Sequence, residues 1–157
     1  MVYNIRSGGT LNEPEVIDRI LKDSHVIAVV GLSNHPERPS YRVAGYLKAQ
    51  GYQIIPVNPA LTEVLGEKSY PDLAAIPGPV DVVDVFRKPE DALPIVEAAI
   101  AKGSKVVWLQ EGVVNQPAAE RAEAAGLLVV MDHCMLKEHK RRRGDAETRG
   151  HGDSVTR

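Results

Sequence analysis

The sequence predicts a single α/β domain built on one parallel sheet that is covered by helices on both faces. Its 157 residues, 43% of them hydrophobic, suit one domain with a sizeable core. The run over residues 25–31 is β-branched and lacks polar alternation, as in a strand buried on both faces. Strand and helix patterns then alternate along the chain, as in crossover units between parallel strands. These observations predict a doubly wound, Rossmann-like sheet.

The N-terminal half of the chain predicts two helices and two strands. Four apolar residues at helical spacing predict a helix over residues 13–23, with Asn12 as its cap. The β-branched run predicts a strand over residues 25–31. A second apolar face at helical spacing predicts a helix over residues 40–50, and a strand over residues 52–59 follows it.

The C-terminal half repeats this alternation, and Gly103 and Gly126 can provide left-handed ends for its two helices. The expected elements are a short extended piece at residues 68–70, a helical turn at 72–75, strands at 81–86, 105–109 and 127–131, and helices at 90–102 and 116–125.

The domain is expected to span residues 1–140, followed by a disordered tail over residues 141–157, because apolar residues almost disappear there. No apolar run approaches the roughly 20 residues of a membrane helix, and the one cysteine, Cys134, has no internal partner. With no signal-peptide pattern at the start, these features predict a protein of the cytoplasm. The net charge of -2 gives no general attraction to nucleic acid, and we interpret the basic run Lys140–Arg143 as part of a solvated tail.

The loop after the first predicted strand is the strongest candidate for ligand binding. Ligands of parallel sheets bind beyond the carboxyl ends of the strands, and this loop enters a helix whose free amides suit a phosphate. Gly31 lets the backbone approach a ligand, serine hydroxyls can donate hydrogen bonds, and Arg38 can pair with a phosphate. The predicted contact residues are Gly31, Leu32, Ser33, Arg38, Ser40 and Tyr41.

A structural interpretation of the same loop is that Ser40 caps the helix and Arg38 is a solvated charge. The length of the loop favours binding, because a capped turn needs fewer residues. Only Gly31 of the three glycines of the dinucleotide fingerprint is present, which argues against NAD and FAD.

Three further loops complete the predicted site. Asn58 and Pro59 stand where dinucleotide enzymes keep an acid for the ribose, and a neutral Asn58 would instead tolerate a ribose phosphate such as the 3′-phosphate of coenzyme A. Phe86 and Arg87 suit adenine or phosphate contact, although a core aromatic ring and a solvated charge explain them equally. The opposite wall of the cleft is predicted to contain Gln110, Glu111 and Gly112.

With these four loops in view, residues 26–138 closely resemble the CoA-binding domain family of small stand-alone bacterial and archaeal proteins. This family shares its fold with the CoA-binding domain of the succinyl-CoA synthetase α subunit. The resemblance implies a Rossmann-like sheet with CoA along its carboxyl edge, but not the activity of the synthetase, whose catalytic histidine lies in a further domain. The matching stretches are Ile27–Gly31, Arg38–Val43, Gly51–Pro59, Val82–Arg87 and Trp108–Gly112.

The resemblance also implies a place for each part of the ligand. The pyrophosphate would be held by Gly31, Ser33, Ser40 and Tyr41. The adenosine would be bordered by Asn58 and Pro59, the middle of the ligand by Phe86 and Arg87, and the pantetheine by Gln110, Glu111 and Gly112.

We therefore expect non-catalytic binding of CoA or an acyl-CoA by a carrier, sensor or regulatory module. One alternative is an NAD(P)- or CoA-dependent enzyme that uses Arg87, Glu111 or Cys134. Another is an interaction scaffold with a vestigial nucleotide cleft. The sequence leaves open whether the protein is a homodimer.

Cys134 has two interpretations: an inert buried thiol, or a thiol that faces the thiol of CoA and can form a mixed disulfide with it. A metal site is not expected, because His133, Cys134 and His139 lack the spacing of structural zinc ligands.

Overall fold

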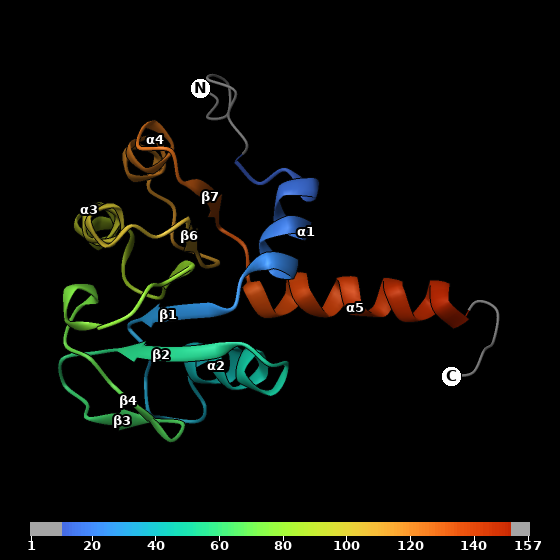
Figure 1. Cartoon of the computed structure of the whole chain (residues 1–157), viewed down its shortest axis with the longest axis horizontal. Coiled ribbons are helices and arrows are strands. Elements are labelled where there is room, and N and C mark those ends of the chain that lie inside the picture. The colour runs from blue at the N-terminus through green and yellow to red at the C-terminus, as the bar shows by residue number, and fades with distance from the viewer. Residues whose placement is uncertain (1–10, 152–157) are drawn as a thin grey trace.

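The structure is a computed structural model that describes residues 11–151, with side chains described through residue 144. Its centre is a five-stranded parallel sheet in the order β2-β1-β5-β6-β7 (Figure 1), which confirms the predicted doubly wound α/β fold. The strands are β1 (Val26–Val30), β2 (Gln53–Val57), β5 (Val82–Val85), β6 (Val106–Leu109) and β7 (Leu128–Met131). The helices are α1 (Pro14–Asp23), α2 (Pro39–Ala49), α3 (Ala92–Lys102), α4 (Gln116–Ala124) and α5 (Met135–His151).

The helices cover the two faces of the sheet in separate groups (Figure 1). Helices α3 and α4 pack on one core through their alanines and valines, whereas α1, α2 and α5 pack on a second core. Strand β5 contributes side chains to both cores: Val83 and Val85 face the core under α3 and α4, and Val82 faces the core under α1, α2 and α5. Side chains alternate across a strand, so Asp84 points to the same face as Val82.

The order of the strands reverses between β1 and β5, so their following loops diverge and leave a crevice at this switch point. Gly31 lies immediately beyond β1 with a φ of 91° and donates its amide to the Val57 carbonyl at 2.9 Å. A Cβ atom on Gly31 would stand 2.5 Å from the Phe86 carbonyl oxygen. Gly31 therefore lets the backbone after β1 approach the backbone after β5, and its predicted approach to a ligand stays a prediction.

Three local features differ from the sequence predictions. Asn12 does not cap α1, whose N-cap is Glu13; instead its side chain bonds the backbone N–H and C=O of Met131 on the edge strand β7. A hairpin of β3 (Glu63–Val64) and β4 (Glu67–Lys68) was not predicted, and neither was helix α5. The short helices η1 (Leu73–Ala75) and η2 (Pro89–Asp91) lie within or beside predicted helical segments.

Helix α5 also corrects the predicted start of a disordered tail at Arg141, because the helix continues to His151. Arg142 anchors its middle: the guanidinium pairs with Asp18 of α1 and, at 2.7 Å, with Glu138 one turn earlier. Such contacts across 124 residues are invisible to local composition. Residues 152–157 of the predicted tail lie outside the described part of the chain.

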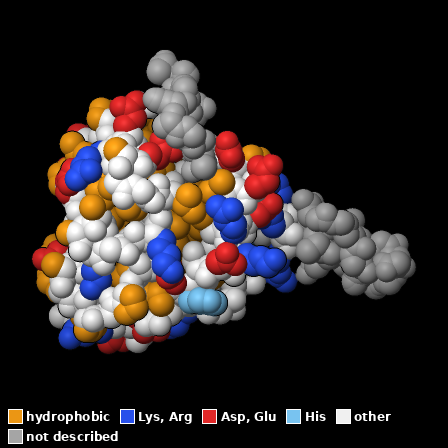
Figure 2. Space-filling model, turned by 45° about the horizontal axis from the view of Figure 1, so that its top comes forward, with side chains coloured by type: hydrophobic (Ala, Val, Ile, Leu, Met, Phe, Trp, Pro, Cys, Tyr) orange, Lys and Arg blue, Asp and Glu red, His pale blue; other side chains and the backbone are white. Residues whose placement is uncertain are grey.

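The surface carries mixed charge. On the face drawn in Figure 2, basic and acidic side chains are interspersed rather than gathered into one basic field. Among residues 11–151, none of the helices combines the length and the apolar composition needed to cross a membrane.

We expect Gly31→Ala to lower the free energy of unfolding by about 2–5 kcal/mol, since a left-handed alanine and a steric clash with backbone both add cost. Gly51→Ala is the matched control, because Gly51 has a φ of 105° but no atom within 4 Å of an added Cβ. The control should lose only about 1–2 kcal/mol. Denaturant unfolding of both variants measures the difference, and equal losses would contradict the tight contact.

Candidate functional site

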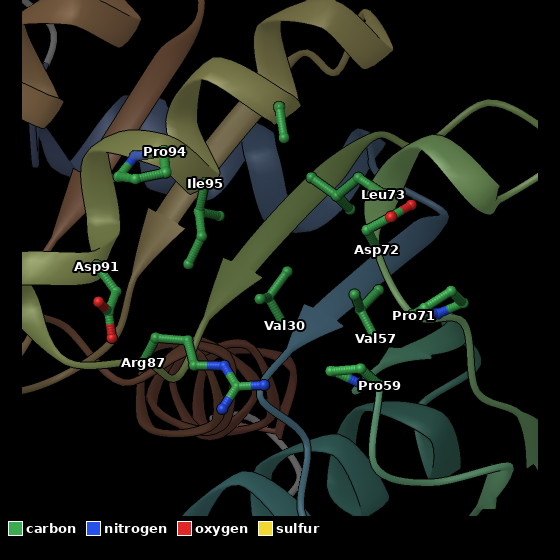
Figure 3. A pocket seen from close by; sticks show the side chains of 11 residues that line it. Val30, Val57, Pro59, Pro71, Asp72, Leu73, Arg87, Asp91, Pro94 and Ile95 are labelled. Carbon is green, nitrogen blue, oxygen red and sulfur yellow. The ribbon is translucent and has the colours of Figure 1, made fainter.

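A cleft of about 390 Å³ opens at the switch point, beyond the carboxyl ends of β1, β2 and β5 (Figure 3). Val30 and Val57, the last residues of their strands, form its floor, and η1 and α3 supply its two sides. The remaining lining residues are Pro59, Pro71, Asp72, Leu73, Arg87, Asp91, Pro94, Ile95 and Ala98.

Arg87 is the cation of this cleft. Its half-buried side chain extends across the ends of β5 and β1 (Figure 3), and its Cδ lies where a Cβ on Gly31 would approach to 3.2 Å. The other ionisable residues of the lining are Asp72 and Asp91. An apolar floor with one guanidinium at its edge suits a flat, phosphate-bearing ligand.

The loop from β1 to α2 is held by its own serines. Ser40 Oγ accepts a hydrogen bond from the Ser33 amide at 3.0 Å, and Ser33 Oγ accepts one from the His35 amide at 3.0 Å. Ser40 is buried and is not the cap of α2, whose N-cap is Arg38 without a side-chain hydrogen bond. Each hydroxyl accepts one of these bonds and keeps its proton for donation.

The other predicted residues of this loop lie in different environments. Leu32 is fully buried, whereas Arg38 is exposed. Tyr41 is half-buried against the core beneath α2, and its amide donates to the Arg38 carbonyl at 3.1 Å.

Asn58 ties two loops together. Its Nδ2 donates to the Leu32 carbonyl at 3.0 Å, and its Oδ1 accepts from the Ala60 amide at 2.9 Å. Both ends of the side-chain amide are therefore engaged within the protein. The neighbouring Pro59 lines the cleft, and its predicted contact with the adenosine stays a prediction.

The loop after β6, which we predicted as the opposite wall of the cleft, lies outside the cleft lining and is organised by Gln110, which is buried and donates to Asp84 Oδ1 at 2.5 Å. The Gly112 amide donates to Asp132 Oδ1 at 2.8 Å, and Asp132 itself has a φ of 64°. Glu111 is exposed and pairs with Lys137 of α5 at 3.1 Å. These bonds join the loop after β6 to the start of α5.

Asp84 is a fully buried carboxyl group that the sequence analysis did not single out. Burial raises its pKa to about 7, although the hydrogen bond from Gln110 acts in the opposite direction. Its Oδ2 has no hydrogen-bond partner among the described residues. An acid within an otherwise all-valine strand was the sequence signal that could have identified it.

Cys134 lies just before α5 and is half-buried. Burial raises the pKa of its thiol, whereas hydrogen bonds from the Lys137 and Leu136 amides lower it; Glu111 and Asp84 raise it further through their charge. The flanking histidines point elsewhere: His133 Nδ1 lies 2.9 Å from the Met131 carbonyl oxygen, and His139 Nδ1 lies 2.8 Å from Tyr46 Oη. No metal-binding group of three or more His, Cys, Asp or Glu side chains is found in the described part of the chain.

The structure thus places all four predicted loops at one edge of the sheet but brings only Pro59 and Arg87 into the cleft lining. Phe86 is half-buried on the core at the opposite face, and its amide donates to the Val30 carbonyl at 2.9 Å. The sides formed by η1 and α3 were missed. Tyr70 pairs with β2 and delivers η1 to the cleft, a long-range pairing that residue patterns do not reveal.

The chain belongs to the CoA binding domain family: the family described by that name matches residues 25–140. The chain is 42% identical over 123 residues to the uncharacterized protein YneT of Bacillus subtilis (strain 168), a match that covers 78% of this chain and 91% of YneT. A hypothetical protein from Pyrococcus horikoshii has a similar solved structure, with a TM-score of 0.80, 46% identity and coverage of 82% of this chain and 90% of that one.

A shorter match extends to a larger protein. Over 57 residues the chain is 46% identical to the α subunit of acetate–CoA ligase (ADP-forming) II of Pyrococcus furiosus. The match covers 36% of this chain but only 12% of that subunit.

We expect Asp84→Asn to raise stability more at pH 8 than at pH 5. An unfolded Asp84 loses its proton above its ordinary pKa of 3.8, whereas the folded one keeps it up to about 7, so folding becomes less favourable as pH rises through this window. The difference between the folded and unfolded pKa of Asp84 corresponds to a loss of stability of at most roughly 4 kcal/mol at high pH. Asparagine, which does not ionise, would remove this loss. Denaturant unfolding at both pH values measures it.

Asp81→Asn is the control for this experiment. Burial would raise the pKa of Asp81, but hydrogen bonds from the Val26 and His25 amides outweigh it and lower the pKa. The stability that Asp81 contributes is therefore lost only as pH falls below its ordinary pKa. Its replacement should cost the same at pH 5 and pH 8, and an equally flat profile for Asp84→Asn would refute the buried neutral acid.

Proposed function

We propose that this protein binds coenzyme A or an acyl-CoA and performs no catalysis on it, as a carrier, sensor or regulatory module. The observation that carries this proposal is the cleft at the β1–β5 switch point, where Arg87 borders an apolar floor in a member of the CoA binding domain family. The similarity to a subunit of an acetate–CoA ligase adds support, because that enzyme acts with CoA.

The adenosine of the ligand fits the cleft. Val30, Val57 and Leu73 offer an apolar surface to the adenine ring, and Pro59 stands at its edge. A volume of about 390 Å³ is in the range of small-molecule sites but holds only part of a ligand as long as CoA. The rest of the ligand must therefore lie along the carboxyl edge of the sheet.

The pyrophosphate fits between Arg87 and the loop from β1 to α2. Arg87 supplies a guanidinium, and the hydroxyl protons of Ser33 and Ser40 supply donors on a loop that their own hydrogen bonds already order. The start of α2 adds the positive end of a helix dipole. Gly31 keeps the two elements close together.

The pantetheine arm then points toward Glu111 and Cys134. The Gln110 side chain and the Gly112 amide are occupied by Asp84 and Asp132, so this wall offers a preformed shape rather than free polar groups. Binding without catalysis is proposed because Asn58 and Gln110 use their side-chain amides to hold the scaffold.

A second candidate is a dinucleotide without a ribose phosphate. Asp72 and Asp91 line the cleft, and a carboxylate there can accept hydrogen bonds from free ribose hydroxyls. The same charges would disfavour the 3′-phosphate of CoA. The neutral Asn58 alone did not indicate such a ligand. A comparison of the affinities for CoA and NAD therefore decides between the two candidates.

Isothermal titration with CoA, 3′-dephospho-CoA, NAD and ATP at one salt concentration tests the proposal. We expect CoA to bind most tightly. Preference for NAD would favour the second candidate, and no binding by any of the four to folded, ligand-free protein would refute nucleotide binding altogether.

Replacing Arg87 with methionine, which keeps much of the stem but removes the charge, should weaken CoA binding by about tenfold or more, as expected for a charged hydrogen bond. Lys88→Met is the matched control, because Lys88 is exposed and lies outside the cleft lining. It should bind CoA within about twofold of the unaltered protein at equal salt. Equal losses of CoA affinity in the two variants would mean that Arg87 acts only through the overall charge of the protein.

A further inference from the structure

Asn12 binds the outer edge of strand β7 as a neighbouring strand would. Its Oδ1 accepts a hydrogen bond from the Met131 amide at 2.8 Å, and its Nδ2 donates one to the Met131 carbonyl at 3.0 Å. In an antiparallel sheet, a residue of the next strand would exchange the same two bonds with Met131. Asn12 has a φ of 61°, a left-handed conformation in which asparagine is enriched. One side chain thus takes the place of a strand at this position.

The chain passes from one face of the sheet to the other at Asn12. Leu11 is buried in the core under α3 and α4, whereas Val16 is buried in the core under α1, α2 and α5. Between these two anchors the chain lies against the outer edge of β7, beside which α1 begins (Figure 1). We call the segment Leu11–Glu13 the strap, because it is held on both faces and closes the edge between them.

The sequence of β7 carries none of the usual features that protect a sheet edge. The amides of Leu128 and Asp132 donate to carbonyls of β6 and its preceding residue. The alternate residues Val129 and Met131 therefore turn their backbone groups outward. All four residues of β7 are apolar, without the charge or proline that keeps an exposed edge from pairing with another chain. Such an edge is a template for a further strand unless it is covered.

The opposite edge of the sheet, at β2, is protected in a different way. Its outward-facing residue Pro56 has no N–H to offer, and the Pro56 carbonyl accepts the Tyr70 amide at 3.0 Å. The Tyr70 carbonyl in turn accepts the Asn58 amide at 2.9 Å. A proline and a paired segment of the same chain thus close the edge at β2, whereas the edge at β7 relies on the strap.

We propose that the strap covers an interaction surface, and that β7 pairs with β7 of a second copy of this chain when the strap leaves the edge. Two identical strands related by a twofold axis run antiparallel, so each copy offers the N–H and C=O groups that the other needs. A second copy fits because β7 is complementary to itself and carries no charge that would repel its own copy. This pairing does not depend on bound CoA.

Replacing Asn12 with glycine in the full chain tests the proposal. Glycine adopts a φ of 61° without strain but makes neither side-chain bond to Met131. We expect Asn12→Gly to self-associate at least about tenfold more tightly than the unaltered protein in sedimentation equilibrium, because each copy regains the lost hydrogen bonds from the other. A folded Asn12→Gly protein that self-associates no more than the unaltered one would overturn the proposal.

Asn12→Asp is the matched control at the same position. The carboxylate still accepts the bond from the Met131 amide, and it adds a negative charge beside the edge, which discourages strand addition. This variant should self-associate as weakly as the unaltered protein. Association as tight as that of Asn12→Gly would show that general destabilisation drives it, and the proposal would be wrong.

Hydrogen exchange at the Met131 amide gives a second measurement that does not need a variant. In the unaltered protein this amide should be protected equally at low and high protein concentration, because Asn12 of the same chain binds it. In Asn12→Gly its protection should rise with concentration as the edges pair. An unprotected amide in the unaltered protein, or protection there that rises with concentration, would overturn the proposal even if Asn12→Gly did not fold.

Discussion

The close contact between Gly31 and the Phe86 carbonyl is the constraint on which the carboxyl edge of the sheet depends. It brings the backbone after β1 against the backbone after β5 at the one place where the strand order reverses. Any side chain at position 31 would force the two loops apart, and the cleft beyond them would lose its shape. The hydrogen bond from the Gly31 amide to the Val57 carbonyl ties β2 to the same point. One residue without a Cβ therefore aligns the ends of β1, β2 and β5.

Polar side chains then secure the loops that this contact positions. Ser40 holds the start of its loop through the Ser33 amide, and Asn58 holds the loop after β2 through the Leu32 carbonyl. Gln110 holds the loop after β6 through its hydrogen bond to Asp84. These hydrogen bonds leave the loops already ordered, and we propose that a ligand at this edge meets the serine hydroxyl protons and the Arg87 guanidinium on this scaffold.

The fold could be predicted because its strands are buried on both faces and read as uninterrupted apolar runs. Which loops meet at one edge follows from that topology, and the four candidate loops do meet there. Which atoms line the cleft does not follow: Leu32 and Gln110 lie in two of these loops but are buried, and η1 reaches the cleft only through the pairing of Tyr70 with β2. Helix α5 was missed because Arg142 is anchored by Asp18, far away in the sequence.

Asp84 is a buried residue whose role the local sequence pattern did not predict. In a strand of valines, a fourth valine would fill the position without the cost of burying a carboxyl group. A buried acid with one unpartnered oxygen breaks the rule that buried polar groups are paired, and such breaks cluster where structure serves function. Gln110, which is buried in the loop after β6, engages this acid from the carboxyl edge of the sheet. The acid thus ties the interior of the sheet to a loop at that edge.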